Sequence, residues 1–166
     1  MSRGFVRESD QEPEPFVPPR AVLPEGAPNY VTPRGLRLLH EERDMLEAEH
    51  AGLGDATAGD DVARRSLGVI TKQLQALNAR IASARLVEPE GGEDVRVGAT
   101  VRYKVKGRPK VLAVEIVGVD EANIKQKRVS YLSPLARALY GKKAGEEAEM
   151  EVGGVTRRFE VVGVEY

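Results

Sequence analysis

The chain has 166 residues, 41% of them hydrophobic, which is enough for one ordinary domain or two small ones. Its 25 basic and 26 acidic residues nearly balance, and this balance argues against bulk electrostatic binding of nucleic acid. The absence of cysteine excludes disulfides, thiol chemistry and cysteine-based zinc sites.

Residues 1–30 are predicted to form a proline-rich, flexible tail. Six of the ten prolines fall here, and proline removes a backbone donor and blocks both helices and central strands. Apolar residues along the tail leave a second interpretation open, in which it becomes ordered on a partner surface. The start of the chain lacks the apolar core of a secretory signal and no segment has the length of a membrane span, so we expect a cytoplasmic protein with no membrane partner.

Residues 31–87 are predicted to form an antiparallel helical hairpin, packed as a coiled coil. Its first helix starts at Pro33, with Thr32 as the N-cap, because these residue types are typical of those two positions. Gly52 and Gly54 end this helix. Its apolar stripe consists of Leu36, Leu39, Leu46 and Leu53, widened by Leu38 and Met45.

The second helix is predicted over 60–86, with Asp60 or Asp61 as its N-cap. Its apolar residues recur at alternating steps of four and three, which is a heptad seam kept for three repeats. The seam consists of Ala63, Leu67, Ile70, Leu74, Leu77, Ile81 and Ala84. A short glycine-rich turn favours pairing within one chain over a coiled coil between chains. This helix is predicted to be the longer one, so we expect its surplus end to pack on the domain that follows.

Residues 88–94, EPEGGED, have the composition of a linker. In residues 95–166 the apolar period changes to two, which predicts five strands. One short helix interrupts them, with Ser133 as its N-cap and Pro134 as its first residue. The sequence therefore predicts an α+β protein, in which a helical hairpin precedes an antiparallel sheet domain.

Several motifs of this chain are those of a known family. The segments YVTPRGLRLLHEE, IVGVDEANIKQKRVSYLSPLARALYGKKAGEEAEM and FEVVGVEY resemble the GreA/GreB family of bacterial transcription elongation factors. The resemblance covers residues 30–166, and the tail resembles that of a Gre-like subgroup with short hairpins. It implies that residues 95–166 form an FKBP-like domain that docks on bacterial RNA polymerase, at the rim of its secondary channel. The hairpin would then enter this channel.

The resemblance also concerns the hairpin tip. In family members that stimulate cleavage, two tip carboxylates help hold a catalytic Mg²⁺, and the polymerase itself hydrolyses backtracked RNA, so the factor is not an enzyme. Here the first tip acid corresponds to Asp55, whereas the second falls at Ala58, which cannot bind metal. Asp55, Asp60 and Asp61 could share Mg²⁺ with the polymerase, or Asp60 and Asp61 could simply cap the helix. We expect no intrinsic cofactor and weak or no cleavage stimulation, with a true cleavage factor as the alternative.

By the same resemblance, the polymerase-docking surface comprises Ser133, Pro134, Leu135 and Arg137. Exposed rigid corners and arginine are favoured in protein interfaces. The competing interpretation is a capped helix that packs its leucines into the sheet. Both interpretations can hold if one face packs and the other is exposed.

Three basic residues, Arg102, Lys104 and Lys106, are spaced by two and therefore share one face of a strand. This face could be a solvated face of an antiparallel strand. Alternatively, it could attract nascent RNA or an acidic surface of the polymerase.

Two other classes of function remain as alternatives. An FKBP-like shape makes peptidyl-prolyl isomerase activity one alternative. Residues 88–166, however, have no tryptophan and no aromatic cluster in sequence, which argues against this activity. A generic coiled-coil module would instead bind another protein through the hairpin seam. If the protein is a Gre-like transcription regulator, we expect a monomer whose partner is RNA polymerase.

Overall fold

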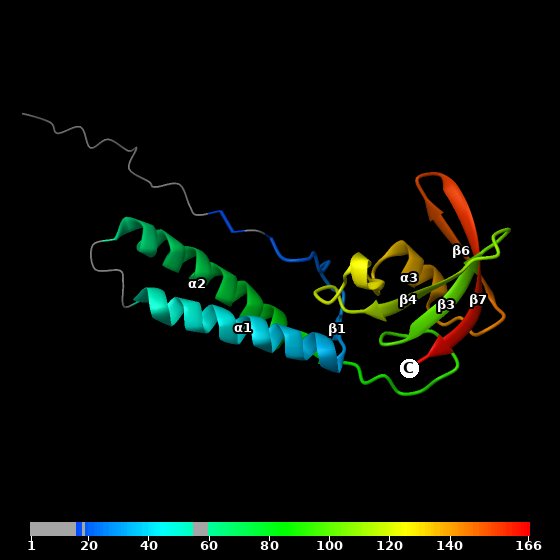
Figure 1. The fold of residues 1–166 in the computed structure, drawn as a ribbon, viewed down its shortest axis with the longest axis horizontal. Coiled ribbons are helices and arrows are strands. Elements are labelled where there is room, and N and C mark those ends of the chain that lie inside the picture. The colour runs from blue at the N-terminus through cyan, green and yellow to red at the C-terminus, as the bar shows by residue number, and fades with distance from the viewer. Residues whose placement is uncertain (1–15, 18, 55–59) are drawn as a thin grey trace, which may run out of the picture.

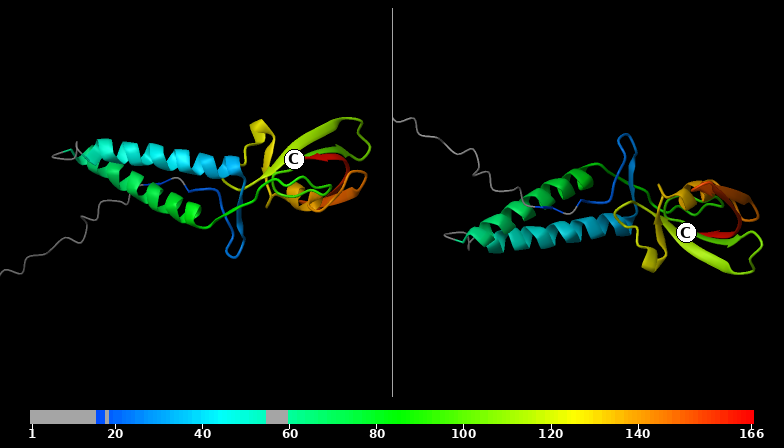
Figure 2. Two further views of the ribbon diagram at one scale, coloured as in Figure 1. Left: turned by 90° about the horizontal axis from the view of Figure 1, so that it is seen from below. Right: turned by 90° about the horizontal axis from the view of Figure 1, so that it is seen from above.

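The computed structural model describes residues 16, 17, 19–54 and 60–166. It is a mixed α+β structure, in which two long helices extend from one end of a five-stranded sheet (Figure 1). The helices and the sheet remain end to end in two further views, so the molecule is elongated (Figure 2). Within the described ranges, no helix is both long and apolar enough to cross a lipid bilayer.

The two long helices, α1 (Pro33–Gly54) and α2 (Asp61–Ala82), lie side by side and run in opposite directions (Figure 1). The predicted start of α1 is confirmed, because the Thr32 hydroxyl accepts a hydrogen bond from the Gly35 amide at 3.0 Å. Each helix has 22 residues, so the prediction that the second is the longer one is wrong. We refer to α1 and α2 together as the helix pair.

The most buried part of the helix pair lies near its base, next to the sheet. Leu39 and Leu77 are 2% and 0% exposed, and they pack against Val31 in one cluster. Leu74, predicted at the middle of the seam, is only half-buried. Met45, predicted to widen the stripe of the first helix, is 72% exposed. The heptad pattern thus predicts the inward face of α2, but not the depth of each position on it.

A two-stranded parallel sheet closes the base of the helix pair. It is formed by β1 (Asn29–Val31) and β2 (Ala84–Leu86). The helix that was predicted to continue through β2 stops before it, because the backbone of this segment pairs with β1. The Asn29 side-chain amide also donates to the Arg80 carbonyl oxygen at 2.9 Å and to the Ser83 hydroxyl at 3.0 Å, where α2 ends. β1 in turn begins inside the segment predicted as a tail.

The five remaining strands form one sheet with the order β5-β4-β3-β7-β6. They are β3 (Thr100–Val105), β4 (Val111–Val117), β5 (Arg128–Ser130), β6 (Glu147–Val152) and β7 (Val155–Glu165). Neighbouring strands are antiparallel except β4 and β5, which are parallel, so the prediction of a purely antiparallel sheet is wrong at this edge. The reason is the connection through residues 118–127, which returns the chain alongside β4 before β5 begins.

The sheet domain has its own hydrophobic core, which is covered by the short helix α3 (Pro134–Leu139). Ala136 and Leu139 of this helix are both 0% exposed. Beneath them, the rings of Tyr103 and Phe159 meet edge to face, with their centroids 5.6 Å apart. This core holds α3 rigidly and fixes which of its residues face the solvent.

Candidate functional site

The residues predicted to dock on a partner lie on α3 and its N-cap. The Ser133 hydroxyl accepts a hydrogen bond from the Ala136 amide at 3.2 Å, so its capping role is confirmed. Leu135 is half-buried and packs against the core of the sheet. Pro134 and Arg137 are exposed. One side of α3 therefore packs inward, and the other presents a proline and an arginine to the solvent.

Two of the three predicted tip acids stand at the start of α2, and Asp55 lies outside the described residues. Asp60 is the N-cap, and its Oδ1 accepts hydrogen bonds from the amides two and three residues further on, at 2.9 and 3.2 Å. Asp61 is exposed and pairs with Arg64 on the next turn. In the part of the chain that the structure describes, no group of three or more acidic or histidine side chains is arranged to hold a metal ion. Both described acids thus have partners on their own helix.

The predicted basic face on β3 is interleaved with acids from other strands. Arg102 Nε lies 3.1 Å from the carboxylate of Glu165 on β7. Lys106 was predicted on the same strand, but it lies one residue beyond the end of β3, and its Nζ is 2.8 Å from the Glu147 carboxylate. Lys104, between them, is half-buried. A cross-strand pair of opposite charge, such as Arg102 with Glu165, stabilises a solvated sheet face. They also reduce the attraction that the three cations would exert on RNA.

A site that the sequence analysis did not identify lies where the helix pair meets the sheet domain, and we call it the junction. Two adjacent acids just after β4 form its centre, and one of them, Glu121, is 5% exposed. Its carboxylate accepts hydrogen bonds from the Thr32 hydroxyl and from Arg34 Nε, each at 2.5 Å. Arg34 also donates to Glu115 of β4 at 2.5 Å. A buried carboxylate is stable only when paired, so these contacts fix the start of α1 to the sheet.

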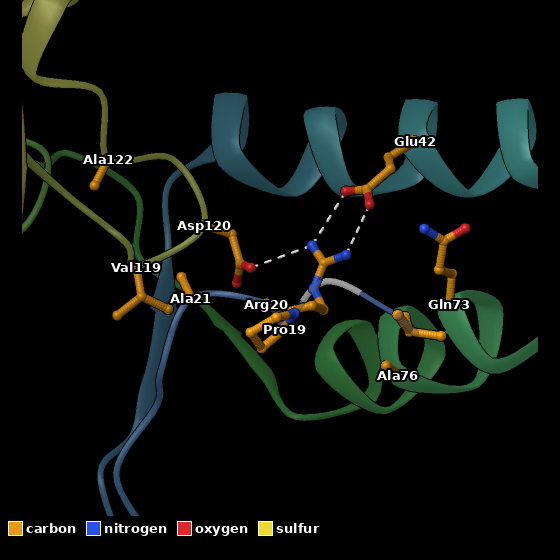
Figure 3. A pocket seen from close by; sticks show the side chains of 10 residues that line it. Pro19, Arg20, Ala21, Glu42, Gln73, Ala76, Val119, Asp120 and Ala122 are labelled. Atoms are coloured by element: carbon orange, nitrogen blue, oxygen red, sulfur yellow. Dashed lines mark hydrogen bonds and ion pairs between the residues drawn. The ribbon is translucent and has the colours of Figure 1, made fainter. Parts of the chain in front are cut away.

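The neighbouring acid, Asp120, accepts a hydrogen bond from one arginine and lies within ion-pair distance of a second. Arg20 donates to Asp120 at 3.2 Å and to both carboxylate oxygens of Glu42 on α1, at 2.7 and 3.1 Å (Figure 3). Arg80 of α2 lies 3.2 Å from the other Asp120 oxygen and donates to the Ala21 carbonyl oxygen at 2.6 Å. The hydrogen bond to Glu42 is the main cause that raises the pKa of Arg20 above its ordinary value, so this guanidinium stays charged.

Close contact between the β1 segment and the sheet domain completes the junction. The rings of Tyr30 and Tyr131 meet edge to face at 5.4 Å, and the Tyr131 hydroxyl donates to the Pro28 carbonyl oxygen. Burial raises the pKa of Tyr131, which keeps this donor protonated. A Cβ atom on Gly118 would overlap the Tyr30 carbonyl oxygen, so β1 lies directly on the end of β4. Only glycine fits at this position without displacing β1.

The sequence offered a weak signal for the junction. Both acids belong to the IVGVDE motif, but no local spacing assigns them a role. Their arginine partners stand 87 and 100 residues away along the chain, beyond the reach of any helix or strand spacing. The usable signal is the pair of adjacent acids, Asp120 and Glu121, directly after a buried strand, because such acids need cationic or hydrogen-bonding partners.

These features define the class: an α+β protein whose helix pair is tied at its base to a five-stranded sheet domain. A family model described as "Transcription elongation factor, GreA/GreB, C-term" matches residues 89–166. The transcription elongation factor GreA of Verminephrobacter eiseniae is 33% identical over 152 residues, which cover 82% of this chain and 96% of that protein. The chain therefore belongs to the GreA/GreB family of transcription elongation factors, which confirms the resemblance seen in its motifs.

Two further similar proteins are a GreB factor and a solved Gre-family structure. Transcription elongation factor GreB of Neisseria meningitidis is 30% identical over 154 residues, covering 83% of this chain and 94% of that protein. Among solved structures, GreA factor homolog 1 (Gfh1) of Thermus thermophilus is similar at 20% identity and a TM-score of 0.40. That match covers 82% of this chain and 98% of the other.

Proposed function

We propose that this protein binds bacterial RNA polymerase through its sheet domain and inserts the helix pair, as a hairpin, into the secondary channel. Membership of the GreA/GreB family supports the partner and the FKBP-like character of the sheet domain. The docking surface would include Pro134 and Arg137, because both are exposed on a helix that the core holds rigidly. The proposed regulator acts as a monomer in the cytoplasm.

We further propose that the protein stimulates transcript cleavage weakly or not at all. The observation that supports this is the engagement of Asp60 as an N-cap and of Asp61 with Arg64. A carboxylate held toward its own helix is poorly placed to reach a metal ion beyond the tip. Few oxygen ligands would also bind Mg²⁺ weakly, because this ion gives up its water reluctantly. Any Mg²⁺ near Asp55, Asp60 and Asp61 would therefore be shared with the active centre of the polymerase.

Charge reversal on α3 is expected to weaken polymerase binding. Pro134→Glu and Arg137→Glu each place a carboxylate on the exposed side of the helix, and each should raise the Kd for core RNA polymerase about tenfold, which is about 1.4 kcal/mol. Because both positions are exposed, the fold should persist, and circular dichroism would verify this. The measurement is a titration of the fluorescently labelled full chain with core polymerase.

The matched control is Arg108→Glu, in the turn between β3 and β4. Arg108 is also an exposed arginine of the sheet domain, but it lies outside the proposed surface. This variant should keep the Kd of the unsubstituted protein, which would assign the loss to α3 and not to net charge. Folded variants at Pro134 and Arg137 that bind with unchanged Kd would refute the proposed surface.

A further inference from the structure

The N-terminal segment, residues 16, 17 and 19–28, contacts three separate parts of the molecule. It runs along the helix pair and reaches β1 at the base (Figures 1 and 2). Its side chains line a pocket of about 520 Å³ together with residues of α1, of α2 and of the loop after β4 (Figure 3). The residues that line it include Arg20, Glu42 and Asp120. The segment is therefore part of the junction.

Arg20 is at the centre of this contact. It belongs to a group of four charges, each from a different element: Arg20 from the segment, Glu42 from α1, Arg80 from α2 and Asp120 from the loop after β4. The side chains of Arg80 and Asp120 are only 12% and 11% exposed, and that of Arg20 is 21% exposed. Attraction between charges so placed is screened less than attraction between surface charges. Without Arg20, Glu42 would lose its guanidinium partner, and Asp120 would be left with Arg80.

The two adjacent acids of the junction have different effects on the helix pair. Glu121 holds the very start of α1, through Thr32 and Arg34. The Arg34–Glu115 ion pair and the contact of Tyr30 with Tyr131 lie at this same end of the pair, so together they restrain swinging less than a contact farther along α1 would. Asp120 supplies a second anchor, because Arg20 connects it to Glu42 farther along α1 and Arg80 connects it to α2. Two anchors at different points on the pair fix its direction.

We propose that Arg20 is a positioning residue, which sets the angle between the helix pair and the sheet domain. The consequence for transcription rests on the proposed function: if the sheet domain docks on polymerase, Arg20 determines where the tip of the helix pair points. The angle itself is a property of the free protein and can be measured without polymerase.

The test uses the full chain in solution, which has no cysteine, so spin labels attach only where a cysteine is introduced. Glu49→Cys on α1 and Thr156→Cys on β7 provide two exposed label sites for double electron–electron resonance. In this background, Arg20→Gln should broaden the distance distribution and shift its mean, whereas Arg20→Lys, which keeps the charge, should remain closer to the parent. Arg37→Gln is the matched control, because the ion pair of Arg37 with Glu41 lies within α1, at 3.8 Å.

The proposal is supported if Arg20→Gln broadens the distribution at a temperature where circular dichroism shows the variant to be folded, while Arg37→Gln does not. A parent-like distribution in Arg20→Gln, or equal broadening in both variants, would overturn it. Asp120→Asn tests the same anchor from the other side and should broaden the distribution as well. A titration with core polymerase separates the two proposals, since absence of binding by the parent protein would refute docking and leave the measured angle unaffected.

Discussion

Replacing Leu77 by alanine is expected to lower the free energy of unfolding of the helix pair by about 2–5 kcal/mol. Leu77 is 0% exposed and packs with Leu39 and Val31 at the base of the pair. Because β1 closes this base, the surrounding side chains have little freedom to fill the cavity that the substitution leaves. Urea unfolding, followed by the circular dichroism of the helices, measures the loss.

Two truncations on the same helix pair serve as controls. Leu74→Ala, at a half-buried position, should cost less than Leu77→Ala. Met45→Ala, at a position that is 72% exposed, should change the free energy of unfolding by no more than about 0.5 kcal/mol. Equal losses at Leu74 and Leu77 would show that the base is not the best-packed part of the pair.

Gly118→Ala is expected to push β1 away from the sheet domain and to cost about 1–3 kcal/mol. The added Cβ would overlap the Tyr30 carbonyl oxygen, and this is a backbone atom that no side-chain rotation can move aside. The displacement should separate Tyr30 from Tyr131 and disturb the hydrogen bond between Thr32 and Glu121. Urea unfolding measures the loss of stability. Faster hydrogen exchange of the β1 and β2 amides would show that the disturbance lies at these strands.

Gly52→Ala is the matched control, because it adds the same methyl group in α1, where no atom lies within 4 Å of the new Cβ. Alanine is the better helix former, so this variant should gain up to about 1 kcal/mol. The same substitution should thus lower the free energy of unfolding at Gly118 and raise it at Gly52. Unchanged stability and unchanged exchange in Gly118→Ala would contradict the close contact between β1 and β4.

The parts of the fold that the sequence predicts well are those that depend on neighbouring residues. The N-caps Thr32, Asp60 and Ser133 are confirmed, because a capping side chain bonds to an amide two or three residues further on. The change of apolar period from helical to strand-like correctly predicts two long helices followed by the five strands of the larger sheet, but it misses β1 and β2. Periodicity also identifies the inward face of α2.

The parts that the sequence could not predict depend on residues far apart in the chain. The heptad pattern continues through Ala84, yet α2 ends earlier because β1 pairs with this segment. Leu77 is more deeply buried than Leu74 because Val31 of β1 covers it, and periodicity gives no measure of depth. Asp120 is part of a recognised motif, but its role depends on arginines brought from distant segments.

Substitutions at the tip acids can test whether the protein stimulates cleavage while its fold is preserved. Asp60→Ser removes a carboxylate but retains a good N-cap, whereas Asp60→Ala removes both and should cost about 1 kcal/mol. Asp60→Ser therefore separates a metal-binding role from a capping role. The same reasoning supports Asp55→Asn and Asp61→Asn, which keep the size of each side chain.

The most direct measurement is transcript cleavage in a backtracked elongation complex, with and without the full protein. We predict that the protein binds the complex and adds little or no Mg²⁺-dependent cleavage, and that Asp60→Ser and Asp55→Asn behave like the parent. Robust Mg²⁺-dependent cleavage with the parent protein, abolished by Asp55→Asn or by the Asp60→Asn/Asp61→Asn double substitution, would contradict the account and identify a true cleavage factor.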